Sequence, residues 1–489
     1  MSRVLAFDLG ASSGRAMLGE YVDGQITMEE IHRFPNEPVM VRGTLFWDVL
    51  RLFHEIQTGI TRAVHFGGFD SLGIDTWGVD FGLIRSTGQL IGNPVHYRDR
   101  RTDDFESCPV TPEEAYEATG MQIIFFNTIY QLNAIARKQS YLLAETDKML
   151  LMPDLFNYML CGTKRSEYTI ASTTEMLNAR TREWDEELVR KAGISERILC
   201  DIVMPGTYCG TLSPDICESL GAPEADVMCI ASHDTASAVA AVPTQERDFI
   251  FLSCGTWSLL GTVLDEPLIN EKAFKYNFTN EGTVGGKIQF LKNIMGTWLI
   301  QESRRQWGRE NEVYSYADLE GMAQAVMPFR CFVDVEDSRY EKPGNLPERI
   351  REYCTDTNQY VPAGPGEVVR CIDESLAMKY RYTIECLEEC TGRSYNRIYV
   401  LGGGAKSALL CQMTADATGR EVVAGPYEAT VLGNMGVQLI GHGDVSDLTE
   451  LRAAIAGSIT LVHYYPKNTS AWDSAYAAYR ELLDREGRA

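Results

Sequence analysis

Two segments that lie half a chain apart follow the same pattern, and they constrain the fold more than any other feature. Near the start, RVLAFDLGASSGRAMLGEY (residues 3–21) combines an apolar strand, a turn of small residues and a second apolar strand. The segment FIFLSCGTWSLLGTVL (249–264) repeats this order, and Gly10 and Gly255 take similar places in the two turns. A chain of 489 residues is too long for one hydrophobic core. The repeat therefore predicts two domains of one type.

The remaining chain predicts an α/β fold class. Strand-like runs recur with helical stretches between them, which is typical of α/β proteins. The apolar pattern breaks in VPTQERD (242–248), so we expect an N-terminal domain over 1–243 and a C-terminal domain over 244–489. Helices are predicted in 373–390 and near the C-terminus.

Composition excludes several classes of partner. The net charge of −23 disfavours binding to nucleic acids and to anionic membranes. We find no apolar run of transmembrane length and no leader peptide, so a cytoplasmic location is expected. The thirteen cysteines form no CxxC pair, which predicts free thiols and no structural metal site. A disulfide between Cys354 and Cys371 is the alternative for that pair.

An aspartate stands at a strand-to-helix junction in CIASHDTASAVAAV (229–242). The apolar residues before it predict a buried strand, and the small residues from Thr235 onward predict a buried helix. One interpretation is structural, because Ser232 or Asp234 would make a good N-cap. The other is functional, with the Asp234 carboxylate acting in chemistry.

The turn DLGASSGR (8–15) has the composition of a phosphate-binding loop. Glycines permit tight backbone geometry, successive amides can hold phosphate oxygens, and hydroxyls and a guanidinium add donors. In this turn Gly10 and Gly14 permit the tight geometry, Ser12 and Ser13 offer hydroxyls, and Arg15 adds positive charge. Asp8 could hold a hydrated Mg²⁺ ion. An ordinary hairpin turn is the alternative, and no Walker A or GxGxxG pattern is present here.

Two further turns extend this picture. SCGTWS (253–258) would be a second phosphate-binding turn, with hydroxyls from Thr256 and Ser258. LGGGAK (401–406) follows a strand and opens a helix, and its glycines could admit an adenosine, although tight packing explains such a turn equally well. Three such turns spread along the chain fit a nucleotide held between two domains.

At this point the sequence resembles the FGGY carbohydrate kinase family, within the actin/Hsp70/sugar-kinase superfamily. The resemblance runs from about Val4 to Ile440. The segments that carry it are DLGASSGR, GIDTWGVDF, YRDRRT, FNTIYQL, LLMPDLFNYMLCG, EYTIASTTEMLN, ASHDTASAV, LSCGTWSLLG, TNEG, LKNIMGTWLIQE and AGPYEATVLGNMG. It implies two actin-like (ribonuclease H-like) domains that face each other across a nucleotide- and sugar-binding cleft.

The resemblance also implies roles for single residues. Asp234 matches the position of the base that takes the proton of the attacking sugar hydroxyl. The positions that match sugar contacts are Gly78, His233, Thr235 and Asn293, with Trp77 and Asp80 as neighbours. Besides Ala11 through Arg15, the positions that match ATP contacts are Thr256, Gln301 and Gly403, with Gly404 beside it. Gln301 follows Asn293 by eight residues, and we expect both on one helix.

Two departures from the family pattern matter. NTIYQL replaces the K-L-x-W pattern of glycerol and xylulose kinases, which favours the deoxyketose branch. GGGAKS replaces the related GGGxQN, so Lys406 or Ser407 could alter nucleotide preference.

The function that the resemblance implies is ATP-dependent phosphorylation of L-rhamnulose at its 1-hydroxyl. A kinase of a related sugar such as L-fuculose is one alternative. A non-catalytic nucleotide- or sugar-binding protein on the same scaffold is another. The expected partners are a small sugar and MgATP, without nucleic acid or membrane, and a monomer is preferred over a dimer.

Overall fold

The computed structural model describes residues 1–485, and the chain divides into two compact units. The first unit consists of Met1–Gln245, Val263–Phe290 and Ala429–Ile459. The second consists of Glu246–Thr262, Leu291–Glu428 and Thr460–Ala489. Each unit combines helices with strands of a large sheet, so the predicted α/β class is confirmed.

The first unit contains the N-terminal sheet. The strands of this unit, which also include three two-stranded sheets and one strand (β15) of the other large sheet, are β1 (Ser2–Leu9), β2 (Ser13–Val22), β3 (Gln25–Pro35), β4 (Val39–Val41), β5 (Thr44–Phe46), β6 (Ser71–Thr76), β7 (Phe81–Ile84), β8 (Lys148–Leu151), β9 (Ser166–Glu167), β10 (Ile202–Val203), β11 (Thr207–Thr211), β12 (Asp226–Cys229) and β15 (Thr279–Gly282). Its helices are α1 (Val49–His65), α2 (Pro112–Thr119), α3 (Thr128–Lys138), α4 (Ser140–Glu145), α5 (Met152–Cys161), α6 (Tyr168–Ala171), α7 (Glu186–Lys191), α8 (Pro214–Leu220), α9 (Asp234–Ala240), α10 (Glu271–Lys275), α16 (Ala429–His442) and α17 (Leu448–Ser458).

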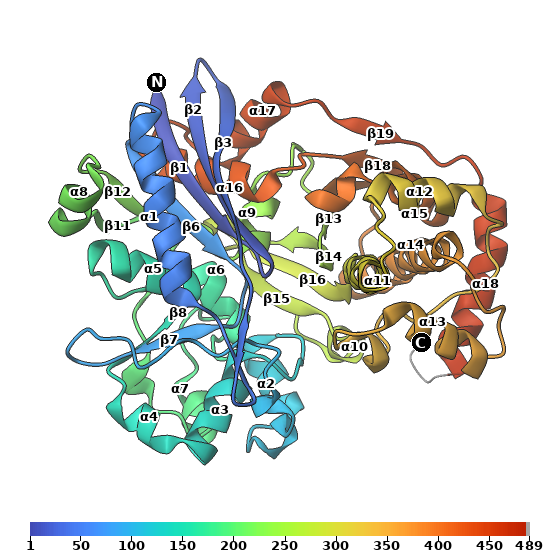
Figure 1. The fold of residues 1–489 in the computed structure, drawn as a ribbon, viewed down its shortest axis with the longest axis horizontal. Coiled ribbons are helices and arrows are strands. Elements are labelled where there is room, and N and C mark those ends of the chain that lie inside the picture. The colour runs from blue at the N-terminus through green and yellow to red at the C-terminus, as the bar shows by residue number, and fades with distance from the viewer. Residues whose placement is uncertain (486–489) are drawn as a thin grey trace. The chain divides into compact units, whose positions relative to one another are not determined.

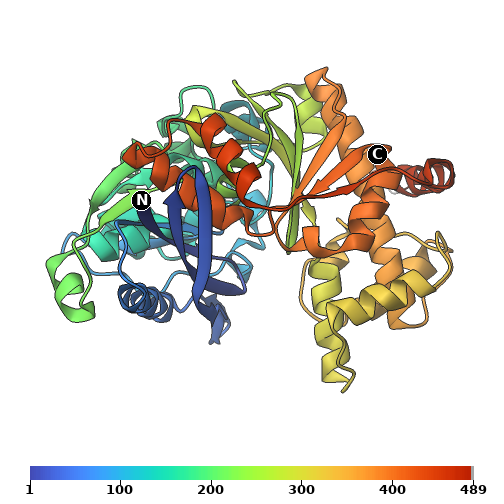
Figure 2. The ribbon, with the colours of Figure 1, turned by 90° about the horizontal axis from the view of Figure 1, so that it is seen from above.

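Strand β1 is continuously apolar from Val4 to Phe7, as expected for a strand whose sheet is covered by helices on both faces. Leu5 and Phe7 pack in one cluster with Ile56 of α1. On the opposite face, Gly19 of β2 leaves room for Met435 of α16, since a Cβ atom at Gly19 would lie 2.5 Å from its Sδ. Figure 2 shows α1 and α16 on the two sides of these strands.

The second unit contains most of the other large sheet. The strands of this part are β13 (Ile250–Cys254), β14 (Trp257–Leu264), β16 (Ile288–Met295), β17 (Arg397–Leu401), β18 (Glu421–Ala424) and β19 (Val462–Tyr464). The helices are α11 (Trp298–Arg309), α12 (Tyr316–Ala325), α13 (Leu346–Asp356), α14 (Pro365–Thr391), α15 (Ala408–Thr418) and α18 (Thr469–Arg485).

The two large sheets repeat one strand order. The first runs β3-β2-β1-β6-β12-β11. The second runs β16-β14-β13-β17-β18-β19 in the corresponding direction, with β15 added beyond β16 (Figure 1). In each sheet, an antiparallel hairpin (β1 with β2, β13 with β14) is joined by a parallel strand on its other side (β6, β17). The strands predicted from the two related hairpins are therefore confirmed, and the similarity extends over whole sheets.

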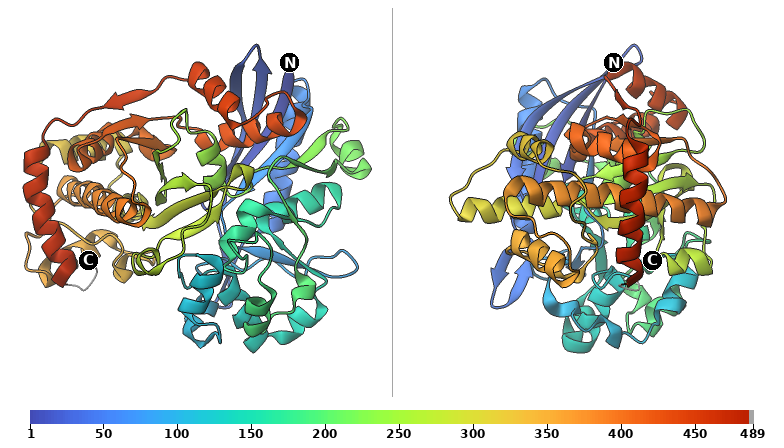
Figure 3. Two further views of the ribbon diagram at one scale, coloured as in Figure 1. Left: turned by 180° about the vertical axis from the view of Figure 1, so that it is seen from behind. Right: turned by 90° about the vertical axis from the view of Figure 1, so that its right-hand side faces the viewer.

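The two helices predicted toward the C-terminus are confirmed as α14 and α18, and α18 crosses beside α14 in the right-hand view of Figure 3. Arg381 of α14 pairs with Asp473 of α18 at 2.6 Å, and Tyr476 donates a hydrogen bond to Glu385 at 2.6 Å. Over residues 1–485, no helix is both long and apolar enough to cross a membrane.

Candidate functional site

The predicted strand-to-helix junction is present, but its aspartate does not cap the helix. Helix α9 begins at Asp234, and the preceding His233 makes no capping hydrogen bond through its side chain. The Ser232 hydroxyl donates to the Ile230 carbonyl instead. The predicted N-cap role of Ser232 or Asp234 is therefore wrong. The Asp234 side chain is 34% exposed and accepts a hydrogen bond from the Thr235 hydroxyl at 3.0 Å, so one carboxylate face stays open to a ligand.

Buried side chains from another segment hold this junction in place. The amide of Ser232 donates to the Glu167 carboxylate at 3.1 Å, and the amide of His233 donates to the Thr169 hydroxyl at 3.2 Å. The Ser232 carbonyl accepts from the amide of Thr76, at the end of β6. These bonds fix the start of α9 to the neighbouring segments.

His233 lies between two carboxylates. Its Nδ1 is 3.2 Å from Glu281 Oε2, and its Nε2 is 3.5 Å from Asp234 Oδ1. Burial by itself lowers the pKa of His233, but the adjacent Glu281 carboxylate outweighs it, so the pKa is raised. Burial raises the pKa of Asp234, and the nearby His233 charge opposes that rise. The Glu281 carboxylate thus favours the protonated form of His233 beside Asp234.

Three carboxylates gather near this point in the first unit. Burial raises the pKa of Asp75 well above its usual range, and the charges of Asp8 and Asp234 add to that rise. Oδ2 of Asp75 accepts from the Asn434 amide at 2.6 Å, while its buried Oδ1 has no hydrogen-bond partner among residues 1–485. An unpaired oxygen among acidic groups fits a hydrated Mg²⁺ ion, which keeps most of its waters and uses few carboxylates.

The residues of the predicted phosphate-binding turn (8–15) differ in their surroundings. The backbone of Gly10 and Ser13 closes the turn with a 2.9 Å hydrogen bond, and Ser12 at its tip is exposed. Gly14 is explained by packing, since a Cβ atom there would lie 2.3 Å from the Phe34 ring.

The Arg15 guanidinium donates to Asp8 at 2.7 Å. It therefore orients the Asp8 carboxylate as well as adding positive charge to the turn.

The turn between β6 and β7 carries the predicted position Gly78. Val79 follows with φ of 67°, a conformation that a β-branched residue rarely adopts. Its amide donates to the Thr173 hydroxyl at 3.1 Å, and its carbonyl accepts from the Thr128 hydroxyl at 2.7 Å. A Cβ atom at Gly78 would lie 3.1 Å from the Thr173 hydroxyl, so the glycine is needed for this close approach.

Asp80 organises the aromatic residues beside that turn. Its buried carboxylate accepts from the indole nitrogens of Trp47 at 2.6 Å and Trp77 at 3.0 Å. The Gln131 amide and the Tyr97 backbone also donate to it, at 3.1 and 3.2 Å. Burial raises the pKa of Asp80 to about 6, although these hydrogen bonds oppose the rise. Residues of YRDRRT and FNTIYQL thus converge on the same carboxylate as Trp77.

The second unit brings together two of the predicted ATP contacts. The Thr256 hydroxyl donates to the Gln301 side chain at 3.3 Å, and Gln301 donates to the Thr297 hydroxyl at 3.0 Å. The Thr297 hydroxyl in turn donates to the Gly255 carbonyl at 2.7 Å. The turn between β13 and β14 is therefore bonded to the first turn of α11.

The triple-glycine turn after β17 has one packed glycine and one open glycine. A Cβ atom at Gly404 would lie 2.1 Å from Cys254 Sγ, so packing requires that glycine. Nothing lies within 4 Å of a Cβ atom placed at Gly403, which leaves it accessible to a ligand. Ser407 caps α15, and Lys406 lies 3.7 Å from Glu428.

One element prediction is wrong. Asn293 lies on strand β16 and Gln301 lies on helix α11, so the two do not share a helix. The strand ends where the amide of Gly296 bonds to the Thr256 carbonyl at 3.1 Å. Asn293 belongs to the second unit, whereas Gly78, His233 and Thr235 belong to the first.

Sequence reasoning also missed residues that support the site. Asp75, Glu167, Glu281 and Asn434 are all buried and polar, and each lies in a segment that carries the family resemblance. The available signal was an acidic or amide group inside a run of apolar or small residues, where burial without a partner is costly.

Comparison with known families matches both halves of the chain. The model of the FGGY family of carbohydrate kinases, N-terminal domain, matches residues 3–241. The model of the C-terminal domain of the same family matches residues 250–442.

Curated relatives match over nearly the full length. The rhamnulokinase of Bacteroides thetaiotaomicron is 42% identical over 483 residues, which cover 98% of this chain and 99% of that protein. The rhamnulokinase of Lactiplantibacillus plantarum is 39% identical over 492 residues, which cover 100% of this chain and 99% of that protein.

Solved structures with low sequence identity share the fold. A ligand-bound xylulose kinase from Lactobacillus acidophilus has a TM-score of 0.82 at 16% identity, covering 100% of this chain and 99% of that one. The glycerol kinase of Plasmodium falciparum with ADP has a TM-score of 0.77 at 13% identity, covering 99% and 98%.

Proposed function

Because the chain belongs to the FGGY family of carbohydrate kinases, we propose that it transfers the γ-phosphoryl group of ATP to the 1-hydroxyl of L-rhamnulose. Full-length relatives near 40% identity that bear the name rhamnulokinase support this substrate. The products are L-rhamnulose 1-phosphate and ADP.

The observation that carries the proposal is the arrangement around Asp234. Its partly exposed carboxylate stands at the fixed start of α9, beside a histidine whose pKa is raised by Glu281. A rigidly placed carboxylate can accept the proton of the sugar hydroxyl as that oxygen attacks phosphorus. We assign Gly78, His233, Thr235 and Asn293 to sugar contacts.

In this proposal the nucleotide binds to the turns at residues 8–15, 253–258 and 401–406. We assign the backbone and hydroxyls of Ala11, Ser12 and Ser13, and the side chains of Thr256 and Gln301, to contacts with ATP. Open space at Gly403 suits the adenosine. Asp8 and Asp75 would hold hydrated Mg²⁺, which neutralises phosphate charge when it is bound.

The remaining assignments follow from the substrate. Since ATP is the co-substrate, we place the enzyme in the cytoplasm. We assign an N-terminal domain to residues 1–243 and a C-terminal domain to residues 244–489. A monomer is preferred because the proposed contacts all come from one chain. Neither nucleic acid nor membrane takes part.

The substrate is tested by measuring sugar-dependent ADP release in a coupled assay with MgATP. The panel contains L-rhamnulose, L-fuculose, L-ribulose, D-xylulose, glycerol and a reaction without sugar. We expect strong turnover with L-rhamnulose only. Preference for another ketose would overturn the substrate but keep the chemistry, whereas ADP release indifferent to every sugar would overturn the kinase proposal.

The Glu281–His233–Asp234 arrangement predicts a pH effect. Glu281→Gln lowers the pKa of His233, so the positive charge that holds down the pKa of Asp234 is lost. The base works only when deprotonated, and activity falls as pH drops through its pKa. We therefore expect the acidic limb of kcat to move to higher pH by about one unit. The exposed variant Glu266→Gln is the control, and an unchanged limb in Glu281→Gln would contradict the arrangement.

The second unit predicts a selective effect on the nucleotide. Thr256→Val removes one hydroxyl and keeps the shape of the side chain. A lost hydrogen bond to a charged group costs about 1.5–3 kcal/mol, so the KM for ATP should rise about 10- to 100-fold with little change for sugar. Steady-state kinetics with each substrate varied measure this, with Thr355→Val as the control. A rise confined to the sugar KM would reverse the assignment.

A further inference from the structure

Three polar side chains meet in the interior of the second unit. Cys254 ends β13, Ser258 lies near the start of β14, and Tyr380 lies on α14. The hydroxyl oxygens of Ser258 and Tyr380 are 2.7 Å apart, and Cys254 Sγ is 3.8 Å from the first and 3.9 Å from the second. Each residue is at most 1% exposed, so these polar atoms depend on one another for hydrogen bonds.

The burial of Ser258 changes its role. The sequence predicts that its hydroxyl binds phosphate, together with that of Thr256. In the structure the Ser258 hydroxyl donates to Cys254 Sγ, which leaves the Tyr380 hydroxyl to donate the 2.7 Å hydrogen bond to Ser258. Ser258 therefore serves the interior, and its predicted phosphate contact is wrong, whereas Thr256 is partly exposed.

The triple-glycine turn (401–406) packs against Cys254. A Cβ atom at Gly404 would lie 2.6 Å from Cys254 Cβ and 3.0 Å from its carbonyl oxygen, and one at Gly402 would lie 3.4 Å from that oxygen. Gly403, which is open to a ligand, stands between these two packed glycines. The position of Gly403 therefore depends on that of Cys254.

The segment that leads into α11 packs against Ser258 in the same way. A Cβ atom at Gly296 would lie 2.7 Å from Ser258 Oγ. The next amide, that of Thr297, donates to the Gly255 carbonyl at 3.0 Å. Gln301 lies in the first turn of the helix that follows, so its position depends on that of Ser258.

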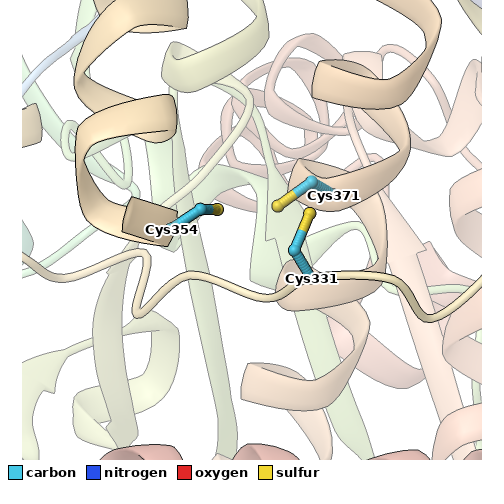
Figure 4. A group of neighbouring side chains, drawn as sticks. All are labelled: Cys331, Cys354 and Cys371. Atoms are coloured by element: carbon cyan, nitrogen blue, oxygen red, sulfur yellow. The ribbon is translucent and has the colours of Figure 1, made fainter. Parts of the chain in front are cut away.

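Helix α14 gives Tyr380 a fixed starting point. The helix is buried over most of its length. Nine residues before Tyr380, Cys371 points toward Cys331 and Cys354, and the three sulfur atoms lie within 4.8 Å of one another (Figure 4). A side chain that stands on a well-packed helix can hold neighbouring turns in place.

We propose that Tyr380 is a positioning residue for ATP. Its hydroxyl holds Ser258, and Ser258 with Cys254 supports the turn of residues 253–258, the triple-glycine turn and the start of α11. Because Tyr380 is fully buried, it acts only through these contacts. The inference rests on the proposed function, in which these three segments of the second unit bind the nucleotide.

The first test is Tyr380→Phe, which keeps the ring and removes the hydroxyl. Loss of this hydrogen bond leaves the turns less well held, so the KM for ATP should rise about tenfold. The Kd for MgADP, measured by calorimetry without sugar, should rise by the same factor. The KM for L-rhamnulose should change less than about twofold, because the proposed contacts of Tyr380 lead only to nucleotide-binding segments.

Tyr479→Phe is the matched control. It also removes a buried tyrosine hydroxyl from the second unit, but that hydroxyl has no hydrogen-bond partner among residues 1–485. Its KM for ATP should equal that of the unmodified protein. An unchanged KM for ATP in Tyr380→Phe, or the same rise in both variants, would overturn the proposal. So would an equal rise in the KM values of both substrates, which marks a general loss of structure.

A double-mutant cycle with Ser258→Ala tests whether the two hydroxyls act through each other. Ser258→Ala alone should also raise the KM for ATP about tenfold, and adding Tyr380→Phe should raise it less than about twofold further. Independent effects would multiply to about a hundredfold and overturn the proposal. If circular dichroism shows that Tyr380→Phe does not fold, Ser258→Ala carries the kinetic test in its place.

The unmodified protein separates this inference from the proposed function. Absence of sugar-dependent ADP release by that protein would overturn the proposed function, and this inference with it. Sugar-dependent turnover of the unmodified protein, with unchanged ATP kinetics in Tyr380→Phe, would overturn this inference alone.

Discussion

Asp234→Asn is expected to lose 10²–10⁴-fold in kcat while the protein remains folded, because that is the usual contribution of a general base. The amide keeps the size of the carboxylate and its contact with the Thr235 hydroxyl, but it accepts no proton from the sugar. The junction itself is held by Glu167 and Thr169, so the start of α9 stays in place. Steady-state kinetics with L-rhamnulose and MgATP measure the loss.

The control for this variant is Asp103→Asn, which makes the same chemical change at an exposed position. Its kcat should equal that of the unmodified protein. Thermal unfolding of both variants checks the fold. Near-normal turnover in Asp234→Asn would show that Asp234 is not the base.

Gly433→Ala is expected to combine a loss of stability with a loss of activity. Gly433 of α16 packs directly on α9, and a Cβ atom there would lie 1.8 Å from the Ser237 carbonyl oxygen. That atom belongs to backbone, so relief requires the helices to separate. Overpacking of this kind costs about 1–3 kcal/mol of the free energy of unfolding. Because α9 carries Asp234 at its first residue, a shift near 1 Å also lowers kcat about 10²-fold.

Gly457→Ala in α17 is the matched control. It is also a helical glycine of the first unit, but nothing lies within 4 Å of the added Cβ atom. Alanine there should be neutral or stabilising by about 0.5–1 kcal/mol. Denaturant unfolding and kcat are measured on both variants. Equal stability of Gly433→Ala and Gly457→Ala would contradict the close packing of α9 and α16.

The duplicated fold could be predicted because its signal is local. Each hairpin places two apolar strands around a short turn of small residues, and this order is visible in the sequence at Gly10 and Gly255. The shared order of strands in the two sheets is not local. It depends on which strands pair after long connections, as β6 pairs with β1 and β17 pairs with β13.

The predictions that failed did so because of contacts between residues that are far apart in the sequence. The apolar run from Asn293 to Gln301 continues across a strand and a helix, so periodicity does not separate them. The break comes from bonds between Gly296 and the distant Thr256 turn. The cap predicted at Ser232 or Asp234 is absent because α9 begins at Asp234, which puts His233 at the cap position, and the Ser232 hydroxyl bonds to the Ile230 carbonyl. The role of Asp234 could be predicted from a segment that resembles the family. The contact of Glu281 with His233 beside Asp234 is visible only in the folded chain.

The central claim is that a sugar hydroxyl, and not water, receives the phosphoryl group. The most direct measurement is phosphorus NMR of a reaction with L-rhamnulose and MgATP. We predict one phosphate ester for each ADP, with its signal split by the two protons on C1 of the sugar. ADP accompanied by inorganic phosphate and no ester, or an ester at another carbon, would contradict the account.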